Sequence, residues 1–124
     1  MTGKNRVTTK DMLKEAKSSE HNESYTVLEK NNNYRVGAGA RLDAASGQPS
    51  FFIEVLIYLC SAPPNTELQG LERRVMFAKE LQTRGYSFNC QDGNILCEIT
   101  ITSAKGLTSE RKAVTSLANR ILQE

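Results

Sequence analysis

The stretch of sequence that decides the fold reads FFIEVLIYLC, from Phe51 to Cys60. It is rich in β-branched and aromatic residues, which favour a strand over a helix. Its short length, with Pro49 before it and Pro63 and Pro64 after it, is typical of a buried strand. We therefore predict a central strand over residues 51–60.

This run is also the longest apolar segment, and it has about half the length that a bilayer-spanning helix needs. The N-terminal residues are polar and lack the apolar region of a signal peptide. Because 16 Lys and Arg nearly balance 14 Asp and Glu among the 124 residues, no large field directs the chain toward nucleic acid or anionic lipid. We expect a soluble, cytoplasmic protein that does not bind membranes.

Two hairpins flank the central strand. Residues 25–30 and 34–42 alternate in polarity around three consecutive asparagines, which tolerate positive φ. Residues 86–90 and 95–101 alternate around Asp92-Gly93, the strongest kind of short hairpin signal. The sequence therefore predicts five strands.

Helical periodicity appears in three places. Apolar residues recur at spacings of three and four from Leu68 to Leu81, after a predicted start at residue 65 or 66 and before Gly85, which suits a helix end. A second apolar stripe follows Thr108, a predicted N-cap, and continues to Leu122. A short helix can also form near residues 9–16, with Thr8 or Thr9 as its cap.

These elements predict an α+β fold in the order (α)-β-β-β-α-β-β-α. We expect a two-layer α/β sandwich, with helices on one face of a mostly antiparallel five-stranded sheet. Residues 24–124 form a single α+β domain in this prediction, and residues 1–23 form a polar N-terminal segment in which a short helix is possible.

The alternation of side chains assigns the two faces of the sheet. Placing Leu42 beside Phe51 keeps the apolar residues of both strands on the face that the helices cover. The opposite face then carries Leu28 and Leu96 together with charged residues. The predicted core comprises Val27, Val36, Ala38, Ala40, Leu42, Ile53, Val55, Ile57, Leu59, Phe88, Cys90, Ile95, Cys97, Ile99 and Ile101.

The opposite face is the candidate functional surface, because an exposed apolar patch bordered by charge is typical of an interaction site. Two glycines in one strand also indicate a shallow groove that another backbone or a flat group can enter. The alternative is that the N-terminal segment or a long loop covers this face. The candidate residues are Arg35, Gly37, Gly39, Arg41, Phe52, Glu54, Leu56, Tyr58 and Glu98.

The leading functional hypothesis is a non-enzymatic protein-interaction module. Its partner is another protein or a second copy of the chain, with a homodimer formed through Phe52, Leu56 and Tyr58. A second hypothesis is single-stranded RNA binding, in which Arg35, Arg41, Phe52 and Tyr58 stack and neutralise nucleotides.

A third hypothesis is a small hydrolase-like enzyme that uses Glu54 and Glu98, since close carboxylates shift one pKa and supply an acid and a base. No Ser-His-Asp set or phosphate-binding loop is present, and the three cysteines and single histidine lack the spacing of metal ligands. We expect no cofactor, no metal site and no disulfide framework.

Overall fold

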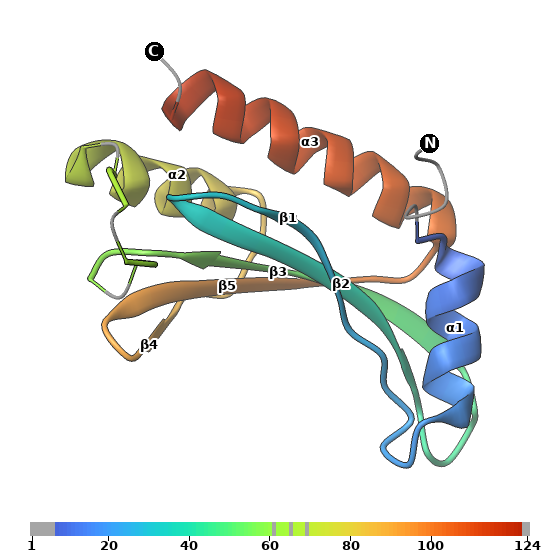
Figure 1. Cartoon of the computed structure of the whole chain (residues 1–124). Helices are drawn as coiled ribbons and strands as arrows, with labels where there is room; N and C mark the ends of the chain where they lie inside the picture. Colours follow the sequence, from blue (N-terminus) through green and yellow to red (C-terminus); the bar gives the residue numbers. More distant parts are fainter. Residues whose placement is uncertain (1–6, 61, 65, 69, 123–124) are drawn as a thin grey trace, which may run out of the picture.

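A computed structural model describes residues 7–60, 62–64, 66–68 and 70–122. These residues form a five-stranded antiparallel sheet and three helices in the order α-β-β-β-α-β-β-α, which confirms the predicted α+β sandwich (Figure 1). None of the helices in these ranges is long and apolar enough to cross a bilayer. The elements are α1 (Thr9–Ser18), β1 (Thr26–Lys30), β2 (Tyr34–Leu42), β3 (Pro49–Ile57), α2 (Leu71–Thr83), β4 (Asn89–Gln91), β5 (Asn94–Ile101) and α3 (Ala104–Leu122).

Both predicted hairpin turns are present. In the first, Oδ1 of Asn31 accepts hydrogen bonds from the backbone N–H groups of Asn33 at 2.8 Å and Tyr34 at 3.0 Å. In the second, Asp92 and Gly93 have φ values of 53° and 82°, as a type I′ turn requires. The strand order is β1-β2-β3-β5-β4, so β3 is the central strand.

The hydrophobic core lies between one face of the sheet and all three helices. Met12 of α1, Phe77 of α2 and Val114 of α3 are at most 1% exposed and belong to the same buried cluster. α1 therefore shares its core with the sheet, although the sequence assigned it to a polar segment outside the domain. The strands contribute Tyr34, Val36, Ala38, Ala40, Phe51, Ile53, Val55, Ile57, Ile95 and Cys97 to this cluster.

The start of α1 is fixed by a capping box. The side chain of Thr8 accepts a hydrogen bond from the backbone N–H of Asp11, and the carboxylate of Asp11 accepts one from the backbone N–H of Thr8, both at 3.1 Å. Of the two predicted caps, Thr8 is therefore the one used. These hydrogen bonds lower the pKa of Asp11.

The pairing of β2 with β3 differs from the predicted register by two residues. Ala40 lies opposite Phe51, and Leu42 lies opposite Pro49. Because side chains alternate with a period of two, this shift changes the neighbours of each residue but leaves the residue on the same face. The predicted faces of both strands are therefore correct although the register was wrong.

On β1, Val27 and Leu28 each lie on the face opposite to the predicted one. A bulge between Val27 and Glu29 turns Leu28 toward the core, where it packs against the buried cluster. Val27 pairs with Gly37 on the other face and is 47% exposed. The assignments of Val27 to the core and Leu28 to the opposite face were wrong, because a bulge interrupts the alternation that they assumed.

The edge strand β4 is also outside the core. All three of its residues are exposed, including Cys90, and the preceding Phe88 is 40% exposed. The prediction of Phe88 and Cys90 as core residues was therefore wrong. β4 has only three residues at the margin of the sheet, so alternation there does not correspond to burial under a helix.

α2 and β3 begin at other residues than predicted. α2 starts at Leu71 with Gly70 as its N-cap, so Leu68 precedes the helix. β3 covers Pro49–Ile57 rather than residues 51–60. At the far end of α2, the predicted helix stop is confirmed, because Gly85 has a φ of 107° directly after the C-cap.

α3 starts at Ala104 and not after the predicted cap Thr108. The hydroxyl of Ser103 accepts a hydrogen bond from the backbone N–H of Gly106 at 2.9 Å, which satisfies a donor of the first turn. This hydrogen bond stabilises the first turn, which contains Gly106, a residue type that is unfavourable within a helix.

Candidate functional site

All three helices contribute to the core on one side of the sheet, and the candidate site lies on the other side, which we call the sheet face (Figure 1). The strands align its residues in rows, in which Val27 lies opposite Gly37, Gly37 opposite Glu54, and Glu54 opposite Glu98. The structure brings eight of the nine predicted residues together here, and Tyr58 directly follows β3. The eight are Arg35, Gly37, Gly39, Arg41, Phe52, Glu54, Leu56 and Glu98.

The groove expected over the two glycines exists, but the chain itself fills it. The ring of Tyr25 lies over Gly37, in the volume where a Cβ at that position would stand. The backbone oxygen of Ser24 occupies the corresponding volume over Gly39. Ser24 is held there because its N–H donates to the carbonyl of Ala40 at 2.9 Å and its hydroxyl accepts from the Ala40 N–H at 3.1 Å. A backbone and a flat ring enter the groove, and both come from the segment before β1.

The apolar residues expected to form an exposed patch are buried. Phe52 is 1% exposed, Tyr58 is 5% exposed and Leu56 is 8% exposed. The ring of Tyr25 stacks on Phe52, with centroids 6.3 Å apart and an angle of 11° between the planes. The guanidinium of Arg41 lies 4.1 Å from the Phe52 ring centroid. The expectation of an exposed apolar patch was therefore wrong, because Tyr25 and Arg41 cover its central residue.

Tyr58 is enclosed in a different way. Its backbone N–H donates to the carbonyl of Asn33 at 3.0 Å, and its carbonyl accepts a hydrogen bond from Nη1 of Arg74 in α2. This residue is therefore tied to the first hairpin turn and to a helix. The alternative expectation was that the N-terminal segment or a long loop covers this face. Ser24 and Tyr25, in the segment before β1, do cover Gly39, Gly37 and Phe52, whereas α1 packs in the core on the other side of the sheet.

Arg41 joins three parts of the sheet face. Its Nη1 lies 2.8 Å from Oε2 of Glu98 on β5, and its Nε lies 3.4 Å from Oε2 of Glu23 before β1. At the same time its planar group covers Phe52. An arginine that bridges two carboxylates and stacks on a ring is well ordered and offers a fixed charged surface.

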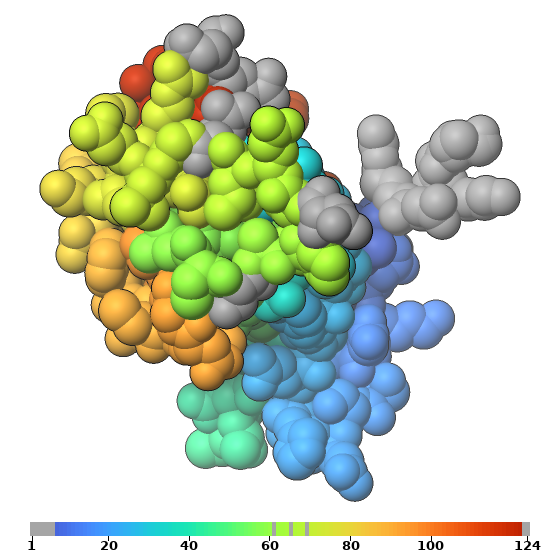
Figure 2. Space-filling view, turned by 60° about the vertical axis from the view of Figure 1, so that its left-hand side comes forward, coloured from blue at the N-terminus to red at the C-terminus, as the bar shows by residue number. Residues whose placement is uncertain are grey.

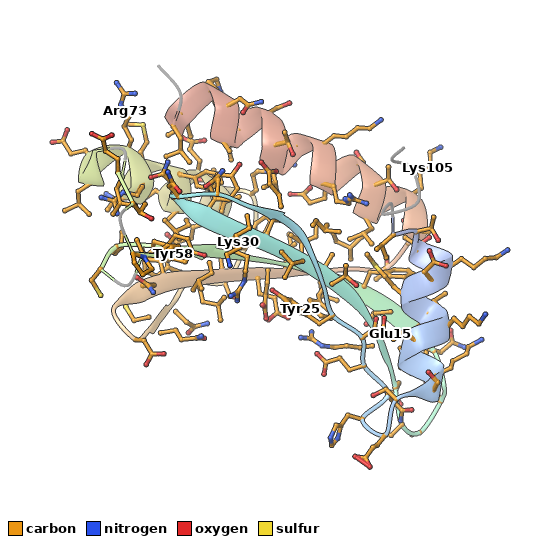
Figure 3. The ribbon with its side chains drawn as sticks, viewed as in Figure 1. Glu15, Tyr25, Lys30, Tyr58, Arg73 and Lys105 are labelled. Atoms are coloured by element: carbon orange, nitrogen blue, oxygen red, sulfur yellow. The ribbon has the colours of Figure 1, made fainter. Side chains whose placement is uncertain are left out.

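Tyr25, Arg35 and Glu54 form a second polar group beside it. The hydroxyl of Tyr25 interacts electrostatically with the charges of Arg35 and Glu54. Burial raises the pKa of Tyr25, while the positive charge of Arg35 lowers it. The Nε of Arg35 is buried and has no hydrogen-bond partner in the described part of the chain. Figure 3 shows Tyr25 on the side of the sheet away from α3.

Glu54 and Glu98 are direct cross-strand neighbours, as the hydrolase hypothesis requires. Burial is the main reason that the pKa of Glu54 is raised, and the negative charge of Glu98 raises it further. However, Glu98 is bound to Arg41, and the positive charges of Arg35 and Arg41 act on Glu54. Both carboxylates therefore have partners within the protein.

Two hollows of the described surface lie elsewhere. One of about 870 Å³ lies between the start of α1 and α3, and one of about 410 Å³ lies on α2. Neither is lined by Glu54 or Glu98. The paired carboxylates thus lie on an open sheet surface and not in either hollow.

The cysteines are free, with Cys60 and Cys90 exposed and Cys97 buried. Burial raises the pKa of the Cys97 thiol to about 11, which keeps it protonated at neutral pH. In the described residues, no group of three or more His, Cys, Asp or Glu side chains is arranged to hold a metal ion.

Sequence reasoning did not assign Tyr25, Ser24 and Glu23 to the site. The signal that points to them is the Gly37-Ala38-Gly39 pattern, because two glycines on one face of an interior strand leave space that another group must fill. The sequence does not say which segment fills it, since that depends on the path of the chain before β1.

No protein-family model matches the chain, and no curated protein or solved structure shows a significant similarity to it.

Proposed function

We propose that this chain is a non-enzymatic protein-interaction module and that its partner binds the sheet face around Tyr25, Val27, Arg35 and Arg41. The observation that carries this proposal is that three helices cover one side of the sheet and leave the other side free of helices. Tyr25 and Val27 are 39% and 47% exposed on that side. They are two of the five large hydrophobic residues exposed in the described ranges. Both are next to Gly37, because the Tyr25 ring lies over it and Val27 is its cross-strand partner.

The composition of the face supports a protein partner. Tyrosine and arginine are the residue types most enriched where proteins bind one another. Stacking on Phe52 and bonding to Glu98 already fix Tyr25 and Arg41, so little side-chain entropy is lost when a partner binds. The face carries both arginines and glutamates, so it complements a partner surface that carries both signs of charge.

RNA binding fits this geometry less well. Bases need exposed aromatic rings on which to stack, and the two rings named for this purpose, Phe52 and Tyr58, are buried. Glu54 and Glu98 add negative charge at the centre of the face, which opposes phosphate groups.

Site-specific photo-crosslinking tests the proposal. A photoreactive residue replaces Thr100, which is exposed on the sheet face opposite Phe52, and a control probe replaces Glu15, which is exposed on α1. In the cells that produce the protein, we expect a discrete protein adduct from the Thr100 probe and none from the Glu15 probe. Val27→Glu, which introduces a charge at an exposed position, should reduce the adduct at least fivefold.

Equal labelling from the two probes, or an adduct that Val27→Glu leaves unchanged, would overturn the proposal. An adduct that ribonuclease removes would overturn it in favour of RNA binding. Thermal unfolding of Val27→Glu controls for misfolding, since the residue is 47% exposed and its replacement should leave the melting temperature close to that of the parent chain.

A further inference from the structure

A second exposed apolar surface lies on α2. The inner side of this helix is buried through Arg74, Phe77, Ala78 and Leu81. On the outer side, Leu71 is 55% exposed and Met76 is 52% exposed, the two largest values among the exposed large hydrophobic residues. Figure 2 shows atoms of α2, in yellow, on the molecular surface.

The outer side of α2 forms a continuous strip, which we call the α2 strip. Among the residues that the structure describes, a hollow of about 410 Å³ is lined by Leu71, Glu72, Val75, Met76 and Lys79. These positions recur at spacings of three and four and therefore share one side of the helix. The apolar residues lie in the middle and at the start of the strip, with Glu72 and Lys79 on either side of Val75 and Met76.

The charges of the strip complement a reversed copy of itself. Glu72 and Lys79 are both exposed, and neither makes an ion pair within the described part of the chain. They are seven residues apart, which is about 10 Å along a helix. A twofold axis midway between Val75 and Met76 sets Glu72 of one copy opposite Lys79 of the other, twice, and sets Val75 opposite Met76.

We propose that a second copy of this chain occupies the α2 strip, with the two α2 helices antiparallel about that twofold axis. An interface of this kind is self-complementary, as a closed dimer requires. It buries the two most exposed hydrophobic residues of the described chain and pairs two sets of opposite charges. A parallel arrangement would instead oppose Glu72 to Glu72 and Lys79 to Lys79.

This dimer is separate from the sheet face. α2 packs against the core side of the sheet, so the sheet faces of both copies stay open for the partner proposed above. The strip has three apolar residues on one helix of 13 residues, which corresponds to a small interface and a weak dimer. We therefore expect association that depends on protein concentration in the micromolar range or above.

Analytical ultracentrifugation of the full chain over a wide concentration range tests the arrangement. The parent chain should form dimers, and Met76→Glu should raise the dissociation constant at least tenfold. Glu72→Lys and Lys79→Glu should each weaken the dimer, because each variant opposes like charges across the axis. The double variant that carries both changes should restore it, since the two charges are exchanged in both copies.

Val27→Glu on the sheet face is the matched control and should leave the dimer unchanged. A parent chain that stays monomeric at the highest concentration would overturn the inference, as would a dimer that Met76→Glu leaves intact or that the double variant fails to restore. A dimer lost in Val27→Glu would place the contact on the sheet face and also overturn it. The crosslinking result at Thr100 is read separately, so failure of the dimer and failure of the partner surface are distinguishable.

Discussion

Tyr25 lies over Gly37, with its ring in the space that a Cβ at position 37 would occupy. This relationship joins the segment before β1 to the second strand of the sheet and covers the neighbouring Phe52. It makes glycine at position 37 a requirement of packing and not of backbone conformation. This contact therefore determines what covers Gly37 and Phe52 on the sheet face.

A double-mutant cycle measures that requirement. Gly37→Ala should lower the free energy of unfolding by about 1 to 3 kcal/mol, because the added methyl displaces the Tyr25 ring. In a Tyr25→Ala background the same change should cost much less. Gly39→Ala is the comparison, since it meets the backbone oxygen of Ser24 and should not be rescued by Tyr25→Ala. Equal rescue at both positions, measured by urea unfolding, would contradict the assignment.

Glu54→Gln should stabilise the protein at neutral pH. Burial and the charge of Glu98 raise the pKa of Glu54 in the folded state, so the folded state holds this proton more tightly than the unfolded state. Stability from this group is therefore present at low pH and is lost as pH rises from the ordinary glutamate value of 4.5 through the raised folded value. Glutamine does not ionise, so the variant avoids this loss of stability. In urea unfolding between pH 4 and 8, the free energy of unfolding of the variant should rise relative to that of the parent chain as pH increases.

Glu98→Gln is the matched control for that experiment. Glu98 is bonded to Arg41 at 2.8 Å, so its neutralisation removes a favourable ion pair as well as the repulsion from Glu54. Glu98→Gln should therefore increase the free energy of unfolding at neutral pH by less than Glu54→Gln does. A larger gain from Glu98→Gln than from Glu54→Gln would show that Glu54, and not Glu98, has the better partners.

The Glu110 carboxylate should make folding sensitive to acid. It accepts hydrogen bonds from Arg84 at 2.9 and 3.1 Å and from the hydroxyl of Tyr86 at 2.9 Å. The bonds from Arg84 lower the pKa of Glu110 most, so this stability is present above the unfolded pKa and is lost as pH falls through the folded pKa. Glu110→Gln should cost about 1 to 2 kcal/mol at neutral pH and flatten the acid side of the stability curve. A variant with the acid sensitivity of the parent chain would assign that sensitivity to other groups.

Leu117→Ala should lower the free energy of unfolding by about 2 to 5 kcal/mol, because Leu117 belongs to the buried cluster under α3 and is 8% exposed. Asn119→Ala, at an exposed position of the same helix, should cost little. Because the contact is within one copy of the chain, the melting temperature should fall equally at low and high protein concentration. A loss confined to high concentration would assign Leu117 to an interface between copies.

The sequence by itself determined the number, order and type of the elements and the faces of β2, β3 and β5. Period-two alternation fixes the face of a residue without the register, so the error of two residues between β2 and β3 had no effect on the faces. Turn chemistry is equally local, and Asp92-Gly93 forms its type I′ turn because glycine and aspartate tolerate positive φ.

Only the tertiary structure decided what covers the sheet face. The bulge at Leu28 exchanged the faces of β1, and the path of the chain before β1 brought Ser24 and Tyr25 over Gly39 and Gly37. Burial of Phe52 follows from these contacts between segments that are distant in sequence, which no local pattern encodes. Exposed apolar surface therefore lies at Tyr25, Val27, Phe88 and the α2 strip, because the sequence sets which residues are apolar and the packing sets which of them remain uncovered.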